Sequence, residues 1–195
     1  MKYVNAMTVE FFYIPSTQEF YFNEVNTRLQ VEHCVTELVT DVDIVKEQIK
    51  IAAGEQLSYT QDDITRRGWA IECRITAEDA ARNFLPSPGE ITGLHLPYGP
   101  GLRIDEGIYE GYTVPFYYDP LLCKMMTWGK TRNDAILRMK RAINETRIDG
   151  IVTNLPFHRI VLEDDEFNSG QYTTDFIEKQ QIIKKVRDKV IETRK

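Results

Sequence analysis

The sequence predicts an α+β fold, and three observations support that prediction. Two aromatic and β-branched runs near the start are typical of a β-hairpin. Short apolar runs divided by glycine and proline in the middle of the chain are typical of a small, partly closed β structure. Segments whose apolar residues lie three and four positions apart predict helices before and after that β structure.

The first two strands are expected at residues 8–14 and 19–25, joined by a turn at residues 15–18. Glycine and proline clusters at residues 85–89 and 97–101 then separate several short apolar runs. These runs predict strands at residues 68–76, around Ile91, at residues 102–105 and at residues 121–128. Strands of this length and spacing form small sheets, which is why the middle of the chain is expected to be rich in β structure.

Helices are expected at residues 41–53, from residue 131, at residues 155–162 and from residue 174 onward. Asp41 or Asp43 can cap the first helix, and Thr131 with Asp134 three residues later resembles a capping box for the second. The second helix should bury one apolar face, made of Ala135, Ile136, Met139, Ala142 and Ile143. The polar segment at residues 56–67 is the best candidate for a domain boundary.

Composition excludes several classes of protein. The chain has 195 residues, of which 42% are hydrophobic and 28% charged, so it can bury a core and is not intrinsically disordered. Its 30 acidic and 24 basic residues give a net charge of -6, which argues against a nucleic-acid binder. The sequence has no long apolar run and no secretory leader, so we expect a cytoplasmic protein with no membrane contact.

Cysteine and histidine do not predict a metal or disulfide framework. Cys34, Cys73 and Cys123 are odd in number, far apart and without a CxxC pair. We therefore expect neither a disulfide nor a cysteine-based zinc site. The histidines are too few and too scattered for a histidine-based metal site and are expected to be structural: His33, His95 and His158.

Residues 24–32 carry the most informative pattern in the sequence, because every second residue is polar. These residues are Glu24, Asn26, Arg28, Gln30 and Glu32. In extended backbone all five side chains point to one face of a strand. The simplest interpretation is the solvent-facing side of an edge strand.

A carboxylate on the preceding strand favours a different interpretation. A hairpin centred on Thr17 places Glu10 directly opposite Glu24, and Glu10 lies in a run that otherwise looks buried. Facing carboxylates require a shared cation or protonation. Because Asn26 adds a neutral oxygen, the set suits Mg²⁺ or Mn²⁺ rather than zinc.

The rest of the polar face adds an anion site and a base. Arg28 offers a planar fork that matches a small carboxylate-like anion. Glu32 is positioned either as a general base toward that anion or as a structural ion-pair partner of Arg28. A metal site, an anion clamp and a base within one short segment indicate ATP-dependent activation of a small oxyacid.

Several motifs resemble one known family. The string EVNTRLQVEH at residues 24–33, followed by VTE, resembles the active-site motif of biotin carboxylase. Biotin carboxylase is the ATP-grasp component of acetyl-CoA, propionyl-CoA and pyruvate carboxylases. Four later blocks resemble the same family in the same order: IECRITAED at 71–79, FLPSPG at 84–89, GYTVP at 111–115 and YDPL at 118–121. The chain departs from the family pattern at Met7, where glycine is usual, and at Cys34, where proline is usual.

The resemblance implies roles for the residues of the polar face. Glu10 and Glu24 would hold the magnesium ions that bridge the ATP phosphates, with Asn26 nearby. Glu32 would take the proton of bicarbonate, so that bicarbonate attacks the γ-phosphoryl group of ATP and gives carboxyphosphate. The residues that would bind bicarbonate are Arg28, Gln30 and the backbone of Val31.

Two arginines outside the polar face also have roles in the family. Arg74 would stabilise the enolate of carrier-bound biotin; the alternative is an ordinary strand arginine paired with Glu72 or Glu78. Arg103 would lie at the interface of a homodimer, or on a plain surface. The other partners that the resemblance implies are a biotin carboxyl carrier protein and a carboxyltransferase component, which selects the final carboxyl acceptor.

The resemblance also implies a domain organisation. Residues 1–66 would be the C-terminal part of an ATP-grasp domain, residues 67–172 the biotin carboxylase C-terminal domain, and residues 173–195 a final helix. The sequence has no glycine-rich phosphate loop before Glu10. We therefore expect a C-terminal portion that is inactive without a missing N-terminal ATP-binding part. The alternatives are another ATP-grasp ligase of the carbamoyl phosphate synthetase type and a non-catalytic dimerisation or interaction module.

Overall fold

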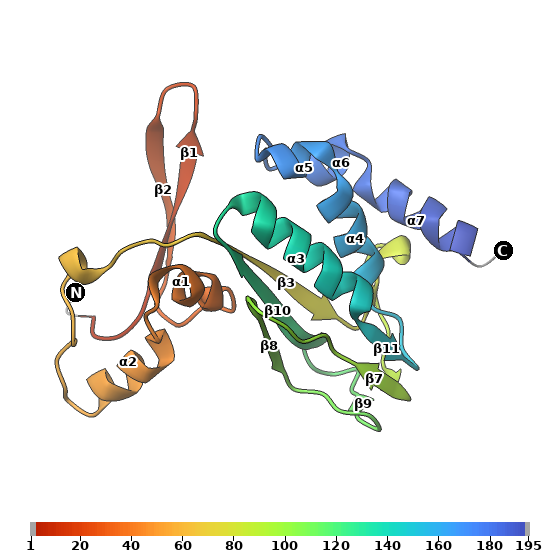
Figure 1. Cartoon of the computed structure of the whole chain (residues 1–195), viewed down its shortest axis with the longest axis horizontal. Coiled ribbons are helices and arrows are strands. Elements are labelled where there is room, and N and C mark those ends of the chain that lie inside the picture. Colours follow the sequence, from red (N-terminus) through yellow and green to blue (C-terminus); the bar gives the residue numbers. More distant parts are fainter. Residues whose placement is uncertain (1–2, 194–195) are drawn as a thin grey trace. The chain divides into compact units, whose positions relative to one another are not determined.

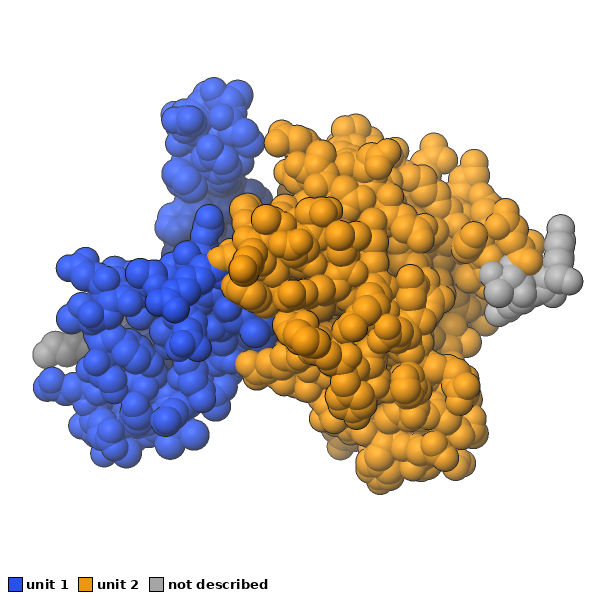
Figure 2. Space-filling view, viewed as in Figure 1, with its two compact units in different colours: residues 1–67 blue, residues 68–195 orange. Residues whose placement is uncertain are grey.

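The computed structural model describes residues 3–193 and divides the chain into two compact units (Figure 2). The first unit ends at Arg67 and the second begins at Gly68. Both units contain helices and strands, which confirms the predicted α+β class. None of the helices in residues 3–193 is both long and apolar enough to span a bilayer.

Between residues 3 and 67, the first unit consists of a β-hairpin, two helices and a short 3-10 turn (Figure 1). Its elements are β1 (Thr8–Ile14), β2 (Glu19–Asn26), α1 (His33–Thr40), α2 (Ile44–Ala52) and the 3-10 helix Gln61–Asp63. The side chain of Asp43 caps α2 by accepting a hydrogen bond from the backbone N–H of Lys46 at 2.8 Å. Asp41 instead ends α1 with a left-handed backbone, at φ 61°. Of the two predicted caps, Asp43 is therefore the one used.

The extended backbone assumed for residues 24–32, which would put their polar side chains on one face of a strand, is wrong beyond Asn26. Strand β2 ends at Asn26, the chain then turns, and Glu32 is the residue that precedes α1. Helix α1 was not predicted, because the alternation of polar residues continues through the turn that separates β2 from α1. A helical pattern was present in the apolar residues Cys34, Val35, Leu38 and Val39.

The hairpin contains a β-bulge. The antiparallel register shifts between Val9 and Phe11, so that Glu10 lies opposite two residues of β2 instead of Glu24 alone. The predicted register therefore applies only at the open end of the hairpin, where Thr8 pairs with Asn26. A bulge turns the strand locally, which re-aims the side chains beside it.

The aromatic run around Glu10 is exposed, which corrects the prediction that it is buried. Phe11 and Phe22 expose 54% and 63% of their surfaces, and Phe12 and Phe20 expose 59% and 68%. The reason is architectural, because the ribbon of β1 and β2 projects away from α1 and α2 within this unit (Figure 1). A two-stranded ribbon with no second layer leaves both faces open.

The second unit is built on an antiparallel sheet with the strand order β3-β10-β8. The three strands are β3 (Trp69–Thr76), β10 (Leu121–Gly129) and β8 (Leu102–Glu106). Short pairs surround this sheet: β4 (Glu78–Asp79) with β5 (Leu85–Pro86), β6 (Gly89–Glu90) with β9 (Thr113–Val114), and β7 (Gly93–His95) with β11 (Arg147–Asp149). A 3-10 turn at Ala80–Arg82 follows β4.

As far as residue 193, five helices complete the second unit. They are α3 (Arg132–Glu145), α4 (Leu155–Glu163), α5 (Asp165–Ser169), α6 (Phe176–Lys179) and α7 (Ile182–Thr193). Thr131 and Asp134 form the predicted capping box at the start of α3, and the predicted apolar face of α3 is buried. The expected single helix from residue 174 is interrupted, because Gln181 adopts a left-handed φ of 50° between α6 and α7.

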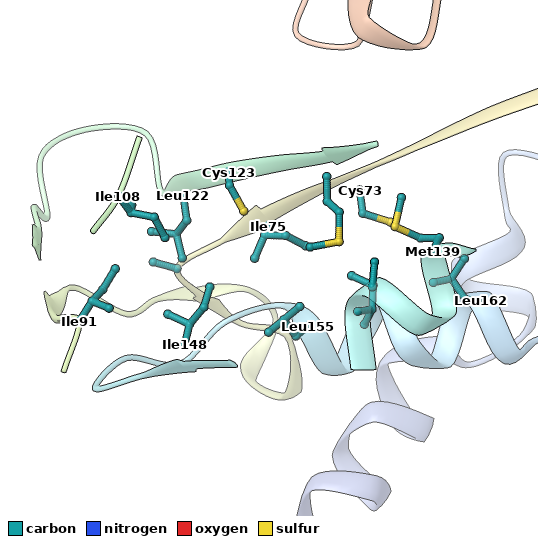
Figure 3. Close-up of a cluster of buried hydrophobic side chains, with 14 of the residues drawn as sticks. Cys73, Ile75, Ile91, Ile108, Leu122, Cys123, Met139, Ile148, Leu155 and Leu162 are labelled. Atoms are coloured by element: carbon teal, nitrogen blue, oxygen red, sulfur yellow. The ribbon is translucent and has the colours of Figure 1, made fainter. Parts of the chain in front are cut away.

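The core of the second unit lies between its main sheet and helices α3 and α4. In Figure 3, Ile75 and Cys73 from β3 share one layer with Met139 from α3 and with Leu155 and Leu162 from α4. Burial raises the pKa of the Cys73 thiol to about 12. The alternation along β3 sends Cys73 and Ile75 inward and leaves its other face for charged residues.

Candidate functional site

The two carboxylates of the hairpin are joined by one amide. Nδ2 of Asn26 donates hydrogen bonds to Oε1 of Glu10 at 2.9 Å and to Oε1 of Glu24 at 3.0 Å. Asn26 lies at the end of β2, and the bulge beside Glu10 lets both carboxylates turn toward it. The structure thus brings together all three residues predicted to hold a metal.

Two residues of the turn after β2 fold back onto this group. Nε2 of Gln30 donates to Oε1 of Glu10 at 3.3 Å, and Nη2 of Arg28 donates to Oδ1 of Asn26 at 3.4 Å. A second guanidinium nitrogen of Arg28 contacts the carbonyl oxygen of Leu29 at 3.2 Å. The side chains of Arg28 and Gln30 lie beyond the end of β2. They still reach Asn26 and Glu10, because the turn after β2 brings them back to the hairpin.

A cavity of about 290 Å³ adjoins this polar group. Arg28, Gln30 and Glu32 line it, together with His33 at the start of α1 and Met7 at the start of the hairpin. Val31, predicted to contribute its backbone, is half-buried and is not among the described residues that line the cavity. A guanidinium, an amide and a carboxylate around one cavity can hold a small anion and accept a proton from it.

The hairpin residues fit a hard divalent cation. Two carboxylates converge on the polarised N–H₂ group of Asn26, which occupies the position between them. A divalent cation at that position would satisfy both carboxylates more fully than an amide does. The side-chain amide of Asn26 can also turn to present its oxygen, which gives the oxygen-only donor set that Mg²⁺ and Mn²⁺ prefer.

Arg74 lies on β3 in the second unit, with its backbone held by helix α4. Its carbonyl oxygen accepts hydrogen bonds from Nδ2 of Asn154 and Nε2 of His158, both at 2.9 Å. Nε of Arg74 is 3.7 Å from Oε1 of Glu72, so the alternative ion pair is present. The Arg74 side chain is 49% exposed while that of Glu72 is 5% exposed. The guanidinium therefore still reaches solvent from a fixed backbone position.

We expect acid to destabilise the second unit through His158. Burial lowers the pKa of His158 below its ordinary value of 6.5, and the hydrogen bond to the Arg74 carbonyl opposes that shift only in part. A depressed histidine pKa means that the unfolded state binds the proton more readily. The stabilising contribution is therefore complete above about pH 6.5 and is lost as the pH falls.

Urea unfolding between about pH 7.5 and about pH 5.5 measures this effect. His158→Gln keeps an amide donor and should make the unfolding free energy less dependent on pH in that range. His95→Gln is the control, because His95 is exposed at the end of β7. An unchanged pH dependence in His158→Gln would contradict the assignment.

Arg103 forms part of a charged network on the main sheet. Its Nε and Nη2 atoms each lie 2.8 Å from one oxygen of Asp105, a bidentate pair. Lys124 on the central strand approaches the same carboxylate at 3.5 Å. Arg103 is therefore oriented by its own strand, with 39% of its side chain exposed.

One cluster was not predicted from the sequence. His33, Cys34 and Glu37, at the start of α1, place one potential ligand atom each within 4.8 Å of one another. A search for paired cysteines could not find this cluster, because it combines a histidine, a cysteine and a glutamate. The available signal was the spacing of His33 and Glu37, which are four positions apart and face the same side of a helix.

Comparison with known families identifies the second unit. Residues 72–179 match the model of the biotin carboxylase C-terminal domain. The chain belongs to the biotin carboxylase C-terminal domain family. Residues 1–60 match the model of the carbamoyl-phosphate synthase L chain, ATP binding domain. Both matches confirm the resemblance drawn from the sequence motifs.

Curated relatives and solved structures agree with this assignment. Biotin carboxylase 1 of Bacillus subtilis (strain 168) is 52% identical over 181 residues, which are 93% of this chain and 40% of that protein. The biotin carboxylase of Haemophilus influenzae is 52% identical over 178 residues, which are 91% of this chain and 39% of that protein. The biotin carboxylase domain dimer of Hydrogenobacter thermophilus 2-oxoglutarate carboxylase, solved with MgADP, ADP and bicarbonate, is similar with a TM-score of 0.89. That match has 42% identity and covers 92% of this chain and 39% of the other.

The chain spans about 40% of the length of these relatives. The matched part of the relatives is their C-terminal portion.

Proposed function

We propose that this chain is the C-terminal part of a biotin carboxylase, which carboxylates carrier-bound biotin with MgATP and bicarbonate. The observation that carries the proposal is the joining of Glu10 and Glu24 by Asn26, next to Arg28 and the cavity. This group combines a site for a phosphate-bound metal with a site for a small anion. The whole reaction requires an ATP-binding part, which the proposal assigns to the remaining length of the relatives.

The proposed first step is proton removal from bicarbonate. Arg28 and Gln30 hold bicarbonate at the cavity, and the Glu32 carboxylate accepts its proton. The proposed contribution of the Val31 backbone rests on the family resemblance alone, because Val31 is not one of the described residues that line the cavity. An oxygen of the resulting carbonate then bonds to the γ-phosphorus of ATP, while the bond from that phosphorus to ADP breaks. The products of this step are carboxyphosphate and ADP.

The proposed second step transfers carbon dioxide to biotin. Carboxyphosphate splits into carbon dioxide and phosphate, and the phosphate takes the proton from N1 of biotin. Arg74 stabilises the enolate oxygen that forms, because a fixed cation favours the charged state. The bond from N1 to carbon dioxide then completes carboxybiotin. The partial exposure of Arg74 and its fixed carbonyl support this role.

The metal is proposed to be Mg²⁺ or Mn²⁺, held by Glu10 and Glu24 with Asn26. When bound, it neutralises negative charge on the ATP phosphates. The Hydrogenobacter thermophilus domain was solved in complex with MgADP and bicarbonate, which supports the choice of metal and anion. In this chain the carboxylates and the amide supply only oxygen donors, which agrees with that choice.

The proposal includes four partners. They are the biotin carboxyl carrier protein, a carboxyltransferase component, an N-terminal ATP-binding part and a second copy of the chain. A relative described as a dimer supports self-association, and Arg103 is the residue proposed for that interface. The exposed aromatic hairpin supports a covering ATP-binding part. A cytoplasmic location is also proposed, and three free cysteines support a reducing compartment.

The test is biotin-dependent ATP hydrolysis with bicarbonate. The chain is assayed alone and after mixing with the segment of Bacillus subtilis biotin carboxylase 1 that it does not match. We expect activity only in the mixture, since the chain spans about 40% of the length of that relative. A folded, associated mixture without activity would favour the non-catalytic interaction module. Activity that requires ammonia instead of biotin would favour a carbamoyl phosphate synthetase-like ligase.

A further inference from the structure

We propose that His33, Cys34 and Glu37 form a zinc-binding site at the start of helix α1. Their imidazole, thiol and carboxylate ligand atoms all lie within 4.8 Å of one another. This separation is small enough for one ion to reach all three with minor side-chain movement. The site has different donors from the oxygen-only group of Glu10 and Glu24, although His33 also lines the cavity beside that group. The proposal does not depend on the proposed carboxylase function.

Helix geometry explains why these residues meet. His33 and Glu37 lie four positions apart in α1, and Cys34 and Glu37 lie three apart. Side chains with these spacings are neighbours on the same helix surface. The cluster is therefore built by local structure and does not require contacts from distant parts of the chain.

The imidazole of His33 is held in the form that binds metals. Its Nδ1 atom lies 2.7 Å from the carbonyl oxygen of Gln30. Because a carbonyl oxygen only accepts, Nδ1 carries a hydrogen, which leaves Nε2 as the ring nitrogen that can bind a metal. Zinc-binding histidines commonly donate their other ring N–H to a backbone carbonyl in this way.

The distance between the first two ligand atoms fits tetrahedral zinc. Nε2 of His33 is 3.5 Å from Sγ of Cys34. Typical zinc–sulfur and zinc–nitrogen bonds of about 2.3 Å and about 2.0 Å would place these atoms about 3.5 Å apart in a tetrahedron. On binding, the Cys34 thiol loses its proton to solvent and a sulfur–zinc bond forms.

Glu37 is oriented by the next helix. Its Oε1 atom accepts a hydrogen bond from the backbone N–H of Ile44 at 2.9 Å, which fixes the carboxylate at the end of the turn between α1 and α2. Carboxylates that bind metals are similarly held by a second hydrogen bond. Three protein ligands leave the fourth zinc position for water, as in open zinc sites.

The donor set identifies zinc as the occupant. A mixture of nitrogen, sulfur and oxygen suits a borderline ion, whereas Mg²⁺ prefers oxygen alone. Cys34 is fully buried, so the ion approaches through His33 and Glu37, which are half-buried. The other two thiols do not compete, because Cys73 and Cys123 lie in the core of the second unit with their pKa values raised to about 12.

Cobalt titration of the untagged full chain tests the proposal. Co²⁺ replaces zinc and gives a thiolate-to-cobalt charge-transfer band together with intense visible bands when four-coordinate. We expect both at one equivalent, and their loss when one equivalent of Zn²⁺ is added. A magnesium excess should leave the spectrum unchanged, because the sulfur ligand excludes that ion.

Substitutions of single residues test which side chains bind the metal. Cys34→Ser and His33→Ala should each weaken cobalt binding by at least about tenfold, and Cys34→Ser should remove the charge-transfer band. Cys73→Ala is the control and should retain both. Circular dichroism shows that each variant is folded. The proposal is overturned if the chain gives only the weak spectrum of six-coordinate cobalt, or if Cys34→Ser binds cobalt with the original affinity and spectrum.

Discussion

Replacing Glu32 with glutamine is expected to lower kcat for biotin carboxylation by about 100- to 10,000-fold, the range for loss of a general base. The assay uses the chain combined with the proposed ATP-binding part. Glutamine keeps the size of the side chain but cannot accept the bicarbonate proton. The fold should survive, since Glu32 is exposed and glutamine has nearly the same size and shape. The measurement is the rate of biotin-dependent ATP hydrolysis.

Arg28→Ala supplies the second half of this prediction. The substitution removes the guanidinium that lines the cavity, so carboxylation should be nearly abolished, and the KM for bicarbonate should rise in the residual activity. Glu55→Gln is a matched control, because Glu55 is an exposed carboxylate just beyond α2. Near-normal rates of biotin-dependent ATP hydrolysis in Glu32→Gln or Arg28→Ala would contradict the proposed bicarbonate site.

Gly150→Ala is expected to destabilise the second unit by about 3 kcal/mol. Gly150 follows β11 with a left-handed φ of 95°, which alanine adopts only with strain. A Cβ there would also overlap the carbonyl oxygen of Glu90 and lie 3.0 Å from the backbone nitrogen of Thr92. Backbone atoms cannot rotate away, so the β structure around β6 must shift.

Gly111→Ala separates the two causes of that loss. Gly111 has a similar φ of 89°, but a Cβ there meets no atom of residues 3–193 within 4 Å. We therefore expect it to cost about 1 kcal/mol, from backbone strain alone. Urea unfolding followed by tryptophan fluorescence reports on this unit, because Trp69 and Trp128 both lie in its main sheet. Equal losses in the two variants would contradict the steric argument.

Elements with local causes were predicted well from the sequence. Helix α3 has both its capping box at Thr131 and Asp134 and its apolar face within one short run of residues. The meeting of Glu10 with Glu24 and Asn26 followed from hairpin pairing, which is also local. Such features depend on few residues, so their patterns are not overridden by the rest of the fold.

Features that depend on the path of the backbone were predicted poorly. The alternating residues 24–32 satisfy a strand pattern, but the chain leaves β2 after Asn26 and begins α1 after Glu32. Sequence alternation cannot show where a strand stops pairing, because pairing depends on the partner strand. The bulge near Glu10 was not predicted for the same reason. The proposed zinc cluster became visible only once His33 and Glu37 were placed on one helix.

The strand order of the main sheet controls when the second unit can fold during synthesis. Strand β3 is made before its partner β10, which ends at Gly129, and the two hydrogen bonds between Thr76 and Asn154 join residues 78 positions apart. Until those later segments leave the ribosome, Ile75 and its apolar neighbours have no layer to cover them. The unit must therefore fold late and nearly at once, which exposes the nascent chain to aggregation and to chaperones.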